Sequence, residues 1–169
     1  MWFINENVAE AAIVAGNNFR EEVWGTSMSD KWQYQVRVTL EEEQAAQARR
    51  DVNDARLAPL GEILTKHNAI LKCQYEAFAD YCKAAEKEGT DQYPLYQWTK
   101  DTIDDPQKKA KYLKSFTFCV DGNEIYDKNK ADPLEADLQP LAANGLIGSL
   151  TKHDTNPANN PQPPKKYRQ

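Results

Sequence analysis

The sequence predicts an α+β fold in which a long amphipathic helix and several short helices pack on a small antiparallel sheet. Residues 31–40 alternate strictly between apolar and polar side chains, as in a strand with one buried face. Apolar positions between Leu60 and Glu88 recur at steps of three or four residues, the spacing of one helix face. Residues 115–120 and 124–127 flank an Asp-Gly-Asn sequence that favours a hairpin, so they supply two further strands.

The elements before the long helix follow from capping and helix-breaking residues. Residues 1–25 are predicted to be helical, with a break near Gly16. The strand 31–40 leads directly into another helix, because Thr39 and Glu42 fit a capping box. Pro59 ends that helix and suits the first turn of the next one.

The long helix of residues 60–88 carries an unbroken apolar stripe, here called the helix seam, and Gly89 suits its end. The seam is longer than three short strands can cover. We therefore predict that it contacts a partner or a second copy, and that its larger side chains are also buried. The seam residues assigned to partner contact are Leu64, His67, Leu71 and Phe78, and those expected to be buried are Leu64, Leu71, Phe78 and Cys82.

Short helices are predicted for the segment that follows. One covers residues 94–103, a second begins at Asp105-Pro106, and a third begins at Asp132-Pro133 and ends near Gly145. Residues 1–151 are assigned to one domain, and residues 152–169 to an extended, Pro-rich tail with basic residues. The tail is predicted to dock on a partner through Lys165, Lys166, Tyr167 and Arg168.

Composition excludes several classes of function. Only 31 of the 169 residues are Leu, Ile, Val or Phe, so the core is thin, and no stretch of about 18 apolar residues could span a membrane. A net charge of −5 makes broad nucleic-acid binding an unfavoured function. The three cysteines lack metal-site or disulfide spacing, which favours reduced thiols in an intracellular setting, the cytoplasm or a virus particle, and not a secreted protein.

No residue pattern indicates a catalytic, cofactor or metal site. The acidic residues Asp101, Asp104 and Asp105 fit helix capping better than a weak cation site. The sequence therefore predicts a non-enzymatic structural or interaction subunit of a larger protein assembly, and an accessory protein of a virus (phage) particle would fit. Two alternatives stay open. One is a small acidic inhibitor that covers a nucleic-acid-binding surface of another protein. The other is a binder of single-stranded nucleic acid that uses Trp32 and Tyr34.

Overall fold

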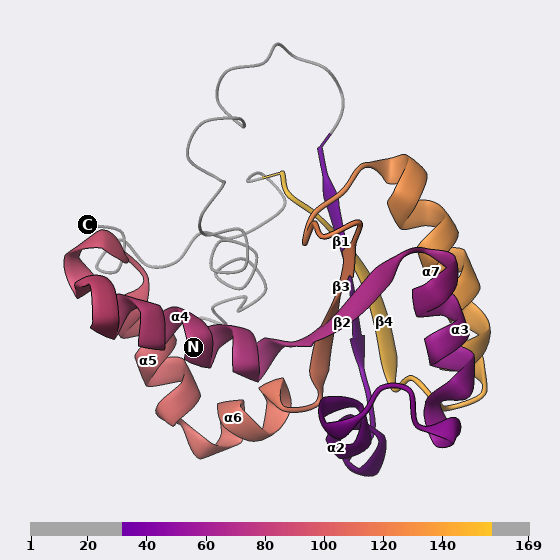
Figure 1. Ribbon diagram of the computed structural model, residues 1–169, viewed down its shortest axis with the longest axis horizontal. Coiled ribbons are helices and arrows are strands. Elements are labelled where there is room, and N and C mark those ends of the chain that lie inside the picture. Colours follow the sequence, from indigo (N-terminus) through magenta and orange to yellow (C-terminus); the bar gives the residue numbers. More distant parts are fainter. Residues whose placement is uncertain (1–31, 157–169) are drawn as a thin grey trace, which may run out of the picture.

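A computed structural model describes residues 32–156 and shows an α+β fold (Figure 1). Its four strands form one antiparallel sheet in the order β2-β3-β1-β4. The strands are β1 (Tyr34–Thr39), β2 (Ala69–Cys73), β3 (Ser115–Val120) and β4 (Ser149–Asp154). The predicted strands 31–40 and 115–120 are thus confirmed as β1 and β3, the two central strands.

Six α-helices surround this sheet in the described part of the chain. Figure 1 shows α3 and α7 on one side of the sheet and α4, α5 and α6 on the other. Short 3₁₀ turns at Ala55–Leu57 and Thr90–Gln92 join some of them. The helices are α2 (Glu42–Arg50), α3 (Ala58–Lys66), α4 (Gln74–Glu88), α5 (Tyr96–Asp104), α6 (Pro106–Tyr112) and α7 (Lys128–Ala143).

Buried apolar side chains form two clusters. The larger one lies between the sheet and the helices α3 and α7, and includes Val36, Phe118 and Leu138, all fully buried. The smaller one joins α4, α5 and α6 through Phe78, whose ring meets those of Trp98 and Tyr112 edge-on, and it also includes Cys82 and Ile103. Tyr75 packs against both clusters and connects them.

The predicted continuous helix over residues 60–88 is wrong, because a strand interrupts it. Helix α3 ends at Lys66, Asn68 adopts a positive φ of 47°, and β2 precedes α4 directly. Strand β2 pairs with β3 along its whole length, from Ala69–Val120 to Cys73–Phe116. Sheet pairing thus overrides a helical spacing that α3 and α4 each satisfy separately.

The predicted strand 124–127 is also wrong. Asp121 and Gly122 do form the turn, both with positive φ, and Val120 and Asn123 exchange backbone hydrogen bonds across it. The chain then leaves β3, and Tyr126 forms an isolated bridge to Tyr34 of β1, with N···O distances of 2.7 and 2.9 Å. The turn sequence therefore predicts where the chain reverses, but not which strand the residues after the turn pair with.

Helix ends follow the predicted caps at some positions and not at others. Asp105 accepts hydrogen bonds from the Gln107 and Lys108 amides, and thereby begins α6 as predicted. Gly89 ends α4. The predicted capping box is wrong, since the Thr39 hydroxyl instead hydrogen-bonds to the Ser149 hydroxyl at 2.7 Å.

The C-terminal helix and strand differ from the prediction in their bounds. Helix α7 begins at Lys128, so Pro133 lies inside it, and Asp127 caps its start. Strand β4 reaches Asp154, so residues 152–154, assigned by sequence to the tail, belong to the sheet. The predicted helical segment 1–25 and the rest of the tail, apart from residues 155 and 156, lie outside the described residues.

Candidate functional site

The residues of the helix seam do not share one surface. Leu64 is buried in the larger cluster and Phe78 in the smaller one, while Leu71 of β2 is only half-buried. His67 ends α3, where its Nε2 lies 2.7 Å from Asp137 Oδ2 of α7. Burial of Leu64, Phe78 and Cys82 is confirmed, but burial of Leu71 is not, and no continuous seam exists for a partner helix. The predicted tail contacts at 165–168 lie outside the described residues.

The sheet has a second face, here called the polar sheet face, which is polar and is buried along the central strands β1 and β3. The pairing register places Arg37 of β1 between Thr117 of β3 and Thr151 of β4, and Gln35 beside His153. Arg37 is only 5% exposed. The alternation of β1 predicted this face as solvated, whereas the structure buries it.

A cavity of about 190 Å³, here called the polar cavity, opens on this face. Its lining combines two cationic side chains, one histidine, an amide and several hydroxyl groups. No acidic residue is among the described residues that line it. The polar and charged lining residues are Arg37, Lys111, His153, Gln74, Thr39, Ser115, Ser149 and Thr151.

Hydrogen bonds hold several of these side chains in place. The Arg37 Nε donates to Gln35 Oε1 at 2.5 Å, and the Ser115 hydroxyl donates to the Lys111 carbonyl at 3.0 Å. Burial, together with the charge of Arg37, lowers the pKa of His153 to about 4. His153 is therefore neutral at neutral pH, so that Arg37 and Lys111 are the formally charged side chains of this lining.

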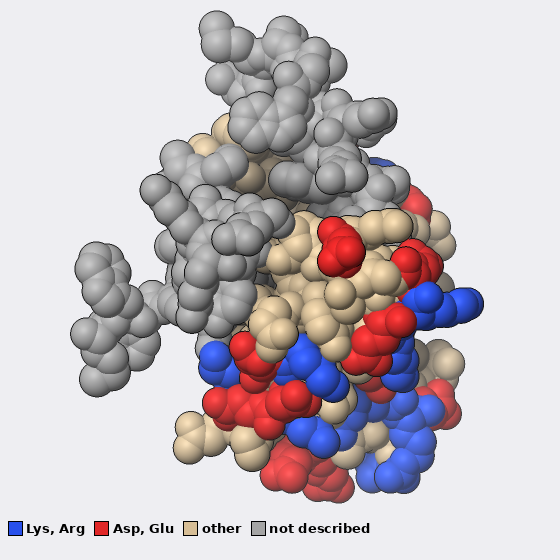
Figure 2. Space-filling model, turned by 90° about the vertical axis from the view of Figure 1, so that its left-hand side faces the viewer, with Lys and Arg blue, Asp and Glu red and all other residues tan. Residues whose placement is uncertain are grey.

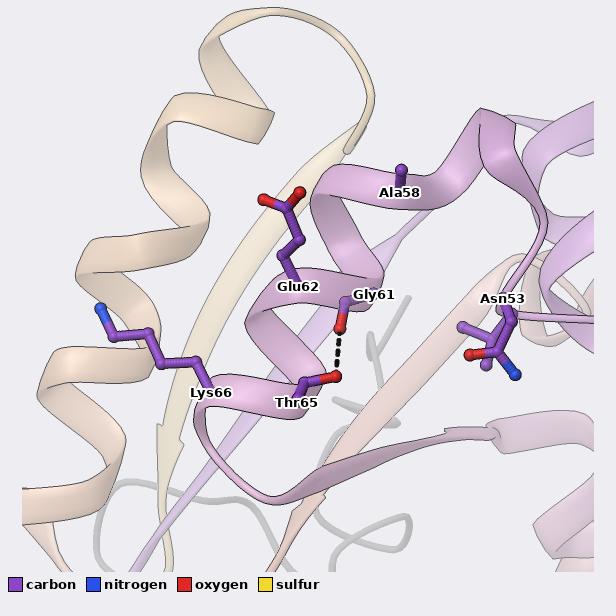
Figure 3. A pocket seen from close by; sticks show the side chains of 7 residues that line it. Asn53, Ala58, Gly61, Glu62, Thr65 and Lys66 are labelled. Atoms are coloured by element: carbon purple, nitrogen blue, oxygen red, sulfur yellow. Dashed lines mark hydrogen bonds between the residues drawn. The ribbon is translucent and has the colours of Figure 1, made fainter.

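A larger groove, of about 510 Å³, runs along α3 (Figure 3). Helix α3 supplies Ala58, Gly61, Glu62, Thr65 and Lys66, and the opposite wall comes from residues 52 and 53. The Thr65 hydroxyl donates to the Gly61 carbonyl at 3.0 Å, so it is used within the helix. This lining offers one carboxylate and one ammonium group but no histidine or cysteine, and it does not assemble a nucleophile with a base.

The outer edge of β2 forms a third candidate surface, here called the β2 edge. Strand β2 lies at one end of the sheet, and its Ile70 side chain is 64% exposed, the more exposed of two large apolar side chains at the surface of the described region. The neighbouring Lys72 forms an ion pair with Glu124 at 3.1 Å. Sequence reasoning missed this edge because it assigned residues 69–73 to a helix.

The three acidic residues that the sequence offered as a weak cation site each contact a neighbouring group of the protein. Asp105 caps α6, Asp104 lies 3.7 Å from Lys100, and Asp101 accepts a hydrogen bond from Gln97. Within residues 32–156, no group of three or more His, Cys, Asp or Glu side chains could hold a metal ion.

The cysteine thiols are buried and unpaired with one another. Burial raises the pKa of Cys82 and of Cys119 to about 11, and it also raises that of Cys73. These thiols are therefore protonated at neutral pH, a state in which cysteine is a weak nucleophile.

The surface observations bear on the two alternative functions. Figure 2 shows Lys and Arg side chains interspersed with Asp and Glu side chains on the described part of one face. That face lacks the continuous acidic area that an inhibitor mimicking nucleic acid would need. Trp32 is 40% exposed, whereas Tyr34 is half-buried beneath the Lys152 ammonium, so the two rings do not form an open stacking platform.

Comparison with known proteins adds no relative. No protein-family model matches the chain, and no curated protein and no solved structure matches it either. No helix among residues 32–156 is both long enough and apolar enough to cross a membrane. The setting in a virus particle stays a prediction.

Proposed function

We propose that this protein is a non-enzymatic assembly subunit that pairs with a second copy of itself through the β2 edge. The exposed Ile70 on an edge strand is the observation that carries the proposal. Edge strands present unpaired backbone groups, and they are the common route by which one chain adds to the sheet of another.

The backbone of β2 has the hydrogen-bonding pattern needed for such pairing. The Asp121 amide donates to the Asn68 carbonyl at 3.0 Å, and bonded pairs of an antiparallel ladder recur at every second residue. Ile70 and Lys72 therefore bond to β3, whereas the N–H and C=O groups of Ala69 and Leu71 point away from it. No described strand pairs with β2 on that outer side.

A second copy fits this edge because the edge is self-complementary. Antiparallel pairing of two β2 strands about Leu71 places Ile70 of each copy opposite Lys72 of the other. An edge lysine usually discourages pairing through its charge, but Glu124 balances the charge of Lys72 here. The register thus brings no like charges face to face.

The test measures self-association of the full chain by sedimentation velocity over a wide concentration range. Ile70→Lys places a new positive charge opposite Lys72 of the second copy, so it should raise the dissociation constant about tenfold or more. Ile70→Glu places the opposite charge there and should weaken pairing less. Ala143→Lys adds the same charge at the exposed end of α7 and should leave pairing unchanged.

The three variants separate the outcomes. A wild-type chain that stays monomeric at every concentration would overturn the proposal. So would an Ile70→Lys variant that associates as well as the wild type, and equal losses for Ile70→Lys and Ile70→Glu would exclude this register. Slower hydrogen exchange of the Ala69 and Leu71 amides at high concentration would support it directly.

A further inference from the structure

We propose that the ion pair between Lys72 and Glu124 makes pairing through the β2 edge depend on pH, so that mild acid separates the two copies. This inference rests on the proposed self-association and adds its regulation. The ion pair lies at the edge itself, because Lys72 belongs to β2 and its Nζ lies 3.1 Å from Glu124 Oε1. Loss of the Glu124 charge therefore changes the surface that the second copy meets.

Two strands hold Glu124 in place. Its carbonyl accepts a hydrogen bond from Gln35 Nε2 of β1 at 3.3 Å, while its carboxylate reaches Lys72 of β2. The Glu124 side chain is 19% exposed, against 40% for that of Lys72. Solvent therefore screens this pair less than it screens a fully exposed pair.

The register of the proposed pairing couples the two copies of this ion pair. When Ile70 lies opposite Lys72 of the second copy, the two Lys72 residues are diagonal neighbours on the same face, with backbones roughly 7–8 Å apart. While both Glu124 carboxylates are ionised, each ammonium group has a counter-charge beside it. When both carboxylates are protonated, two positive charges without counter-charges repel each other across the pair.

Burial makes Glu124 sensitive to mild acid. It raises the pKa of the Glu124 carboxyl above the ordinary value of 4.5, and the Lys72 ammonium opposes this shift only in part. Repulsion between the two Lys72 side chains favours the ionised carboxylates in the paired state. Pairing therefore favours release of the Glu124 proton, and by linkage a fall in pH weakens pairing.

The ionisable groups around Glu124 do not change charge in mild acid. Cys119 of β3 has a pKa raised to about 11 by burial, so its thiol stays protonated. Hydrogen bonds from Lys130 and Asn68 lower the pKa of Asp121, in the turn before Glu124, so this carboxylate stays ionised. His153 of β4 has a pKa of about 4 and stays neutral.

The charge of the whole chain predicts the opposite response to acid. The net charge is −5 at neutral pH, so two copies repel each other, and protonation of carboxylates reduces that repulsion. General charge effects should therefore tighten association as the pH falls. Weaker association in mild acid would instead point to a local ion pair at the interface.

Sedimentation velocity of the full chain at about pH 7.5 and about pH 5 tests the inference, with circular dichroism to establish that the chain is folded at both. The wild-type dissociation constant should rise about tenfold in acid. Glu124→Gln should show the weaker association already at neutral pH and little change in acid. Glu62→Gln is the matched control, because it makes the same change in net charge on the exposed side of α3 and should respond to acid as the wild type does.

A double variant tests the mechanism. Lys72→Gln combined with Glu124→Gln removes the unbalanced ammonium groups, so it should restore pairing at both pH values. Association of the wild type that is equal or tighter in acid would overturn the role of Glu124, as would wild-type association of Glu124→Gln at neutral pH or a double variant that stays weak. A wild-type chain that is monomeric at neutral pH would instead overturn the self-association itself.

Discussion

The hydroxyl of Tyr126 bridges the two central strands of the sheet. It accepts a hydrogen bond from the Val36 amide of β1 and donates one to the Phe118 carbonyl of β3, each at 3.0 Å. The paired residues of β1 and β3 begin at Arg37, so Val36 and Phe118 form the first pair beyond the regular ladder. The phenol therefore occupies the place where the next hydrogen bond between the strands would lie.

Tyr126→Phe removes this bridge and keeps the aromatic ring in the core. Val36 and Phe118 are fully buried and Tyr126 is 3% exposed, so water has little access to the amide and carbonyl that lose their partner. A buried polar group left without a hydrogen bond costs about 1–3 kcal/mol. With two such groups, we expect the free energy of unfolding to fall by about 2–4 kcal/mol.

Urea unfolding followed by circular dichroism measures this loss. Tyr96→Phe is the matched control, because the Tyr96 hydroxyl donates to Glu86 on the exposed side of α4 at 2.9 Å. Its removal should change the free energy of unfolding by no more than about 0.5 kcal/mol. Equal effects of the two variants would refute the structural role assigned to the Tyr126 hydroxyl.

Two further predictions concern pH and a helical glycine. Because the pKa of His153 is about 4 in the folded chain, below the usual 6.5, the unfolded chain binds a proton in this window that the folded chain does not. We therefore expect the free energy of unfolding to fall as the pH drops from about 6.5 to about 4, by up to about 1.4 kcal/mol per pH unit. The fall should be less steep in His153→Gln. Thermal unfolding at several pH values measures both, and an equal dependence on pH in the wild type and the variant would contradict the prediction. Gly61→Ala should stabilise the chain by about 1 kcal/mol, since a β-carbon at this helical position would lie 4.0 Å from the nearest heavy atom, the Val52 carbonyl oxygen. A lowered melting temperature would show that α3 cannot accept the methyl group.

The sequence predicts elements well where local pattern and tertiary environment agree. Strand β1 shows strict alternation, and β3 alternates Phe116, Phe118 and Val120 with smaller side chains, so both central strands were predictable. The start of α6 was predictable because Asp105 caps it through purely local hydrogen bonds. These elements were predictable because the signals that indicate them lie within a few residues in the sequence.

The edge strands could not be predicted because their formation depends on distant residues. Residues 69–73 have helical spacing with their neighbours, and only pairing with β3 makes them a strand. Residues 149–154 place Lys152 on the core-facing side, where a sequence pattern expects an apolar residue. The Lys152 ammonium instead reaches Asp132 at 2.6 Å and Glu135 at 3.2 Å on α7, contacts that no local pattern reveals.

The polar cavity escaped sequence reasoning for a related reason. Its lining comes from β1, β3, β4, the start of α4 and the end of α6, so no single segment carries its signature. The alternation Gln35-Arg37-Thr39 on β1 resembles any solvated strand face. Only the pairing with β4, which places His153 beside Gln35, shows which side chains meet on this polar face.

The break in the predicted long helix explains why the β2 edge and the polar cavity occur together. A continuous helix through residue 88 would keep α3 and α4 on the same side of the sheet. The positive φ of Asn68 and the five residues of β2 instead carry the chain along the sheet, so that α4 emerges on the opposite side from α3 (Figure 1). Gln74, the first residue of α4, then lines the cavity, and α6, which packs against α4 through Tyr112 and Phe78, brings Lys111 to it. The same strand that leaves an open edge thus directs the helices whose side chains complete the cavity.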